Sequence, residues 1–468
     1  MPRMLSAIGC IATLAATCLA GTEPQACGQQ GAAKAGAKNA SEAGAAVDVP
    51  VLSLDEAVAE ALANNRNVKT ASLNVDASRE QLLAARTKRL PSFSTYVFGA
   101  ELLTPVNFTV KEGQFGTFTA TGPIPAADTK ISTSQSPTAY IVATASQPLL
   151  TLYKVNLNLR GQELNVKQAA EQLAGARQTI SASVHQAYYG VVQAAQAVDA
   201  TKASIQQYQE LDRITTQYVS EQTALKSESL QVKAKLAQQQ LSLLQLQDKQ
   251  QSAEENLNEL LGRDISIRFR TAAVAEPSPE EEDLQAAQSK ALSGHPQVKE
   301  AGLTVQQAEI QRRLAKAQYI PDINLSFRYI SPFGVMFLPS NVAAAGFEFT
   351  WDPFDWGARG HQLNQKTIVL EQSKQQLAET KAQILVALNT QFRSLQEARL
   401  AVSVAVANQD AAHEKLRETT MQYGQKTALL RDVLQQQSDA ENADAQYNEA
   451  IASFWTAKAN FQKAMGEE

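Results

Sequence analysis

Two long tracts of the chain carry apolar residues at helical spacing. Residues 149–276 and 354–468 contain no proline and are dense in alanine, glutamine, leucine, glutamate and lysine, which favours uninterrupted helix. Leu230, Leu236 and Leu243 stand among polar residues as a narrow seam, typical of helices packed side by side. Each tract has one weak point, at 220–223 and at 424–427. We therefore predict a helical hairpin in each, the first limb (152–217) extending about 100 Å.

A different pattern precedes the second tract. Apolar and polar residues alternate after Pro321 and again before Pro353, and this period of two predicts strands with one apolar face. The residues of the apolar face, which we expect to contact lipid, are Ile323, Leu325, Phe327, Tyr329, Phe347, Phe349 and Trp351. Those of the opposite face, which we expect to line a lumen, include Asn324, Arg328 and Glu348.

The chain is internally duplicated. When the sequence is aligned with itself, Leu90-Pro91 falls on Ile320-Pro321, and Leu211–Tyr218 falls on Leu416–Tyr423. The second offset is shorter than the first, which locates an insertion in the first half, between its two strands. The segment 104–137 lies there, is rich in threonine, serine, glycine and proline, and predicts an exposed loop.

The duplication organises the prediction. We expect two repeats, 51–263 and 283–466, joined by a linker at 264–282, and each made of a helix, two strands and a long helical hairpin. The strands of the first repeat fall near 93–100 and 138–146. The predicted fold is therefore mainly α with four strands per chain.

Four strands have a consequence for the assembly. Beyond position 20, no apolar stretch approaches the length of a membrane-spanning helix, so entry into a membrane requires strands. Because about eight strands is the smallest bacterial barrel, one chain cannot close one. Two copies give eight strands and three give 12, and arithmetic alone leaves the number open.

The N-terminus reads as a secretory signal. Arg3 precedes an apolar run from Leu5 to Leu19, and Cys18-Leu19-Ala20 is a small-x-small cleavage site. A lipoprotein cysteine at Cys18 is the alternative. Residues 21–50 are rich in alanine, glycine, glutamine and lysine and are predicted to form a disordered leader. Cleavage after Ala20 leaves Cys27 alone, which excludes an intrachain disulfide.

Composition narrows the function further. A net charge of −5 and a pI near 5.7 imply no attraction to nucleic acid. The four histidines are scattered, and no nucleophile motif, metal-spaced cluster or phosphate loop appears. We expect no cofactor, no metal site and no enzymatic activity.

Several motifs, in this order, resemble the TolC-type outer membrane efflux protein family over residues 52–466. They are the duplicated helix starts at Leu54 and Leu284, the Leu/Ile-Pro strand entries, the segment Asp352–Gly357 and the segment Tyr423–Leu434. The resemblance implies a homotrimer in the outer membrane, with a 12-stranded β-barrel and a helical tunnel (α-barrel) through the periplasm. It also implies docking to a periplasmic adaptor and an inner-membrane transporter.

The resemblance further implies a gate where the helical hairpins turn. Asp432 matches an aspartate of the family's pore constriction, while the second such position is Gln435. A closing contact maps onto Glu228 and Tyr423, with Ser227 beside it. The family's arginine is replaced by Ala428, with Lys426 and Arg431 nearby as substitutes. The alternative interpretation is a pair of solvated helix turns.

One other function stays open at this point. A periplasmic coiled-coil scaffold or adaptor without a pore would also need long hairpins, with the strands forming a small soluble domain. A channel predicts detergent-requiring oligomers and conductance, whereas the scaffold predicts neither. Within the channel interpretation, drug efflux, metal efflux and protein secretion share this kind of subunit, so all three substrates stay open.

Overall fold

A computed structural model describes residues 50–101, 103–105, 107–132, 137–272, 283–334 and 339–467. All of them lie in one compact unit, Val49–Glu468. The predicted signal and the leader up to residue 49 lie outside the described residues, as does most of the linker, 273–282.

The same elements occur twice, in the same order. The first set is α1 (Leu54–Asn64), α2 (Arg66–Thr87), β2 (Ser92–Glu101), β7 (Pro137–Pro148), α3 (Leu152–Ser220) and α4 (Lys226–Leu261). The second set is α5 (Leu284–Gly294), α6 (Pro296–Ala317), β9 (Asp322–Phe333), β10 (Val342–Thr350), α7 (Ala358–Gly424) and α8 (Leu430–Met465). The mainly helical fold with two long hairpins is confirmed.

The helix predicted at the start of each repeat is two helices. Asn65 separates α1 from α2, and its side chain accepts hydrogen bonds from the amides of Asn67 and Val68. His295 separates α5 from α6 and accepts one from the amide of Gln297. An acceptor side chain at the N-cap satisfies amides that a new helix leaves unpaired, so the chain ends one helix and starts another.

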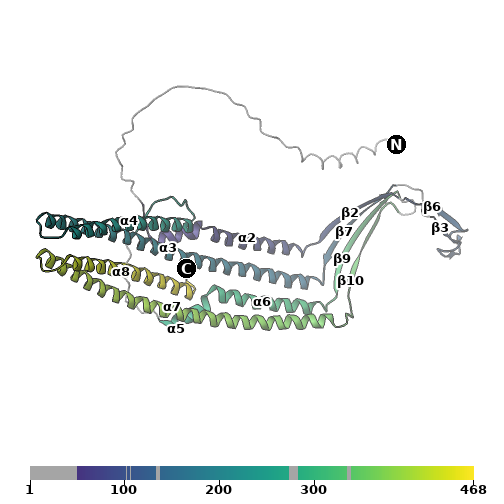
Figure 1. Ribbon diagram of the computed structural model, residues 1–468. Helices are drawn as coiled ribbons and strands as arrows, with labels where there is room; N and C mark the ends of the chain where they lie inside the picture. The colour runs from purple at the N-terminus through teal and green to yellow at the C-terminus, as the bar shows by residue number, and fades with distance from the viewer. Residues whose placement is uncertain are drawn as a thin grey trace, which may run out of the picture. The chain divides into compact units, whose positions relative to one another are not determined.

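The hairpin turns have the same backbone in both repeats. Gln222 and Lys426, which occupy equivalent positions of the duplication, both take the left-handed conformation, with φ of 62° and 64°. The amide and hydroxyl of Thr223 donate to the Tyr218 carbonyl, and those of Thr427 donate to the Gln422 carbonyl. These bonds satisfy the last carbonyls of α3 and α7, and the turns lie at the opposite end of the helices from the sheet (Figure 1).

The four long strands form one antiparallel sheet in the order β10-β9-β7-β2. Leu325 pairs with Phe347 and Ile323 with Phe349, while Asn324 pairs with Glu348. Directly opposed residues point to the same side of a sheet, so the apolar and polar sets occupy opposite faces. Strands β2 and β10 are the two edges.

The insertion is not the plain loop that its composition predicted. Strand β3 (Asn107–Val110) pairs with β6 (Thr129–Ser132), and β4 (Thr117–Phe118) pairs with β5 (Gly122–Pro123), both antiparallel. Strand β10 ends at Thr350, so Trp351 follows the strand directly and is exposed.

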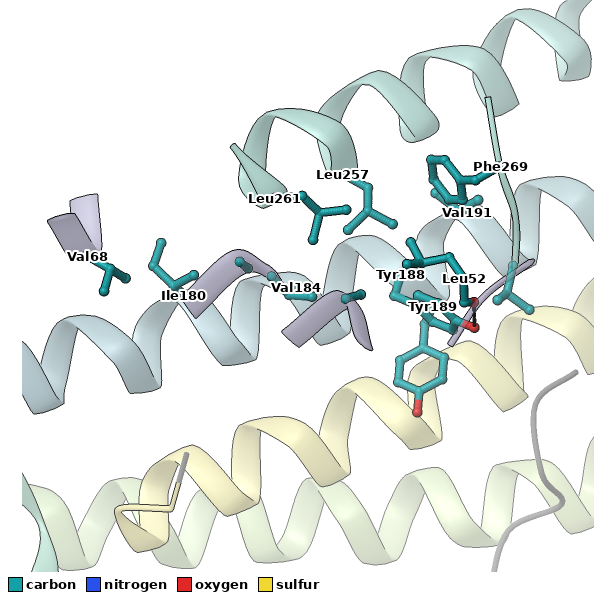
Figure 2. Packing of buried hydrophobic residues seen from close by; sticks show 13 residues of the cluster. Leu52, Val68, Ile180, Val184, Tyr188, Tyr189, Val191, Leu257, Leu261 and Phe269 are labelled. Atoms are coloured by element: carbon teal, nitrogen blue, oxygen red, sulfur yellow. Dashed lines mark hydrogen bonds between the residues drawn. The ribbon is translucent and has the colours of Figure 1, made fainter. Parts of the chain in front are cut away.

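A hydrophobic core midway along the helices joins α1, α3 and α4 (Figure 2). Here β1 (Val51–Leu52) pairs in parallel with β8 (Arg270–Thr271). The buried Tyr188 hydroxyl donates to the Leu52 carbonyl and accepts from the Ala272 amide, both at 3.0 Å. One α3 side chain therefore fastens both strands.

Across the described part of the chain, none of the helices combines the length and the hydropathy needed to cross a membrane.

Candidate functional site

The two hairpin turns meet in a small apolar cluster. Its buried residues are Val232 of α4, Tyr423 of α7, and Leu430 and Val433 of α8. Tyr218 of α3 packs against them, with its ring centroid 6.0 Å from that of Tyr423. Apolar contacts therefore hold the ends of the two hairpins together within one chain.

Tyr423 places a polar atom inside this cluster. The residue is 8% exposed, and its hydroxyl has no hydrogen-bond partner among the described residues. Burial raises the pKa of Tyr423, the neighbouring Thr215 hydroxyl opposes this, and the charge of Glu228 adds to the rise. Glu228 is thus near Tyr423, but the direct closing contact suggested by the resemblance is absent between these two described residues.

Asp432 has a local role at the start of α8. Its Oδ2 accepts from the Leu429 amide at 3.3 Å, and its Oδ1 lies 3.3 Å from the Arg431 Nε. A carboxylate in the first turn of a helix complements the helix dipole. Gln435, one turn further, is exposed and donates to Asp439.

The two candidate substitutes for the missing arginine are engaged elsewhere. Arg431 pairs with Asp432, and the Lys426 Nζ lies 5.2 Å from the Tyr218 ring centroid, a cation–π distance. Ser227 is exposed beside the half-buried Glu228. Tyr218 had been matched to Tyr423 by the duplication, yet the resemblance gave it no role.

A polar network further up the hairpins was not predicted. Glu441 of α8 accepts from Ser204 of α3 and from Gln239 of α4. His413 of α7 lies 2.7 Å from Asp444 of α8 through its Nε2. Glutamine, serine and lone acids at seam positions carry no distinctive spacing, so no sequence signal singled them out. No cluster of potential metal ligands occurs among the described residues.

The sheet presents its apolar side chains to the outside of the chain. Leu325 and Phe327 are 42% and 48% exposed, and Phe347 and Phe349 are 73% and 60% exposed. Large apolar groups left uncovered on adjacent strands mark a surface that contacts lipid or another protein. Tyr329 lies on the same face, where its hydroxyl bonds to Asn341.

A family model described as "Outer membrane efflux protein" matches residues 57–263 and 287–467. The chain belongs to this family. As a member, it is an outer-membrane channel subunit of a tripartite efflux system that includes an adaptor and an inner-membrane transporter, and its helical part lies in the periplasm. Membership decides against the scaffold alternative.

Solved structures share the fold. The CmeC outer membrane channel of Campylobacter jejuni aligns with a TM-score of 0.72 and 17% identity, covering 88% of this chain and 85% of CmeC. VceC from Vibrio cholerae gives 0.69 and 17%, covering 88% and 96%. The open state of the Neisseria gonorrhoeae MtrE channel gives 0.67 and 16%, covering 88% and 89%. Among curated proteins, the sequence search found no match.

Proposed function

We propose that three copies of the chain close a 12-stranded barrel that spans the outer membrane and continues as a helical tunnel. The observation that carries this proposal is the pair of free sheet edges. Neighbouring strands are antiparallel throughout, so β2 and β10 run in opposite directions. The β10 edge of one copy can therefore pair with the β2 edge of the next in the same antiparallel pattern.

Strand length and face chemistry support insertion into lipid. The four strands have 9 to 12 residues, close to the 9–11 or so that span a bilayer when tilted. The aromatic face around Phe347 and Phe349 would meet the acyl chains, and the face of Asn324, Arg328 and Glu348 would line the lumen.

The width of the barrel supports three copies over two. Side chains fill the interior of a barrel of about eight strands, which leaves no path for an organic solute. With twelve strands, three chains would also place twelve helices around the upper tunnel, since α2, α3, α6 and α7 of each chain pack side by side. The proposed assembly transports solutes and catalyses no reaction.

The hairpin turns would form the gate. Three copies of Asp432 around a narrow opening would repel anions, an effect that the neighbouring Arg431 reduces. Tyr423 and Glu228 would hold the two hairpins together in the closed gate, because Glu228 of the first hairpin lies near the buried Tyr423 of the second. Opening requires a partner that binds the separated hairpins more tightly.

The assembly is tested by purifying the protein in detergent, measuring its mass by light scattering and recording in planar bilayers. We expect trimers and single-channel steps. A stable monomer without conductance contradicts the proposal.

The gate is tested with Tyr423→Phe combined with Glu228→Gln in the same bilayers. We expect higher conductance than in the wild type, because the contact between hairpins is lost. Unchanged conductance in a properly assembled trimer removes these residues from the gate and leaves the channel proposal standing.

A further inference from the structure

The helical wall next to the sheet has two surfaces of opposite character. On one side, helices α3, α6 and α7 line a groove with many ionised side chains, among them Arg160, Glu163, Lys167, Glu309, Arg312 and Arg313. On the other side, the same three helices line a groove in which every described lining residue is uncharged. Its polar members include Asn158, Gln162, Asn165, Thr304, Gln307 and Gln311.

Hydrogen bonds between side-chain amides connect α3 and α6 across the uncharged surface. The Gln307 amide donates to the Asn165 side chain at 2.7 Å and to that of Gln168 at 2.8 Å. At its margin, Glu300 of α6 accepts from Gln168 and Gln172 of α3. Glu300 keeps its charge, but it is not among the residues that line the groove.

Contacts between α3 and the sheet show which face of the sheet the uncharged surface adjoins. The Thr151 hydroxyl, at the start of α3, lies 3.2 Å from Asp322 Oδ1 and 3.5 Å from Asn324 Oδ1. Asn324 belongs to the polar face of the sheet, where it pairs with Glu348. Asn158 follows Thr151 by almost two helical turns, so it lies on the same side of α3.

At the α3 end of this junction, two opposite charges form an ion pair. Lys154 lies 2.8 Å from Asp322 through its Nζ. Below it, Gln162 and Asn165 continue the stripe of Thr151 and Asn158 at heptad spacing. The uncharged surface of the helices thus continues the polar face of the sheet, and the charged surface continues the apolar face.

Grooves nearer the turns contain more acidic side chains. A groove lower on the wall still has mainly amides and hydroxyls, with Glu449 as its one described carboxylate. The next groove contains Glu441, Asp444 and His413. Along the helices, acidic side chains therefore increase in number from the uncharged groove toward the turns.

We infer that the uncharged groove lined by α3, α6 and α7 makes the upper tunnel wall a hydrogen-bonding surface with few fixed charges, suited to neutral and zwitterionic organic solutes. The inference rests on the proposed function, in which the polar sheet face lines the lumen. Amides and hydroxyls both donate and accept, so they can replace part of a solute's hydration without retaining it electrostatically. Along the helical tunnel, charge selection is then left to the lower part and the gate, apart from Arg328 and Glu348 on the lumen face of the barrel.

Two exposed glutamines of α6 provide a matched test. Gln311 lines the uncharged groove, and Gln306, on the opposite side of the helix, lines the charged one. Gln311→Glu adds one carboxylate per chain to the tunnel wall, and Gln306→Glu adds the same group outside. At low ionic strength, where screening is weak, we expect Gln311→Glu to raise the K⁺ to Cl⁻ permeability ratio about twofold or more. Gln306→Glu should leave it unchanged.

A second measurement is independent of the gate's own selectivity. Gln311→Cys and Gln306→Cys are made with Cys27, the cysteine expected to remain after cleavage, replaced by serine, and are exposed to a charged, membrane-impermeant thiol reagent. Modification should alter the conductance of the Gln311 variant alone.

The outcomes separate the two ideas. The assignment of the wall is overturned if Gln306→Glu shifts the permeability ratio and Gln311→Glu does not. It is also overturned if neither substitution shifts the ratio. Absence of channels in the wild type overturns the proposed function instead.

Discussion

The two repeats share a backbone plan but differ where each closes its core. Both begin their second helix at a capping side chain, Asn65 or His295, and both end on a left-handed glycine, Gly262 or Gly466, with φ of 72° and 90°. Backbone conformations that only certain residues provide are thus kept.

The core side chains differ. The same alignment that matches Gly262 with Gly466 places Tyr188 on Phe392 and Leu257 on Phe461, and each residue packs in the core of its own repeat. Only the first repeat has a hydroxyl at this position, and only there do β1 and β8 need fastening. The two repeats therefore keep the same backbone conformation at their turns, while their core side chains differ according to the residues that each one contacts.

The glycines give the largest expected effect. A Cβ at Gly262 would lie 2.7 Å from the Asn64 carbonyl oxygen, whereas at Gly466 its nearest atom is the His295 Cα at 3.0 Å. We expect Gly262→Ala to lower the free energy of unfolding by about 2–4 kcal/mol, from left-handed strain plus a backbone clash, and Gly466→Ala by about 1–2 kcal/mol. Thermal unfolding followed by circular dichroism in detergent checks the order. Equal losses would mean that the two repeats close alike.

Tyr188→Phe should come next. It keeps the ring but leaves the Leu52 carbonyl and the Ala272 amide without their partner, at a cost of about 1–3 kcal/mol. The adjacent Tyr189→Phe is the control, since the Tyr189 ring stacks on Trp455 and its hydroxyl has no hydrogen-bond partner among the described residues. A similar loss in both variants would show that ring packing, rather than the hydroxyl, accounts for the effect.

Features set by neighbouring residues could be predicted from the sequence, whereas features set by contacts between distant residues could not. Strand faces were predictable because alternation is local, as with Leu325 and Phe327 against Ser326. The ladder of β3 and β6 was not, because it joins Asn107 to Ser132 through a segment whose composition resembles a loop. Pairing between distant residues leaves little trace in local composition.

The candidate gate was predictable in position but not in contacts. The duplicated weak points located both turns, yet Asp432 caps its own helix and Arg431 pairs with it, which depends on side-chain directions. The uncharged wall was missed for another reason. Asn158, Gln162 and Asn165 are ordinary helix-surface residues one by one, and only packing beside α6 turns them into one surface.

The smallest expected effect concerns the two capping residues and pH. Burial lowers the pKa of His295, and the charge of Lys463 lowers it further, so the unfolded chain binds a proton more readily than the folded one. Stability is then fully present above the ordinary histidine pKa of about 6.5 and is lost as the pH falls from there toward the lower folded value. Protonation also removes the acceptor that caps α6 and places a positive charge at a helix N-terminus.

His295→Asn copies the first repeat, keeps an acceptor and does not titrate. We expect it to flatten the decline of unfolding temperature between pH 7.5 and pH 5.5, leaving the part due to His185, whose pKa burial also lowers. An unchanged slope in His295→Asn would show that this cap does not contribute to the pH dependence and that the two repeats differ there in residue type alone.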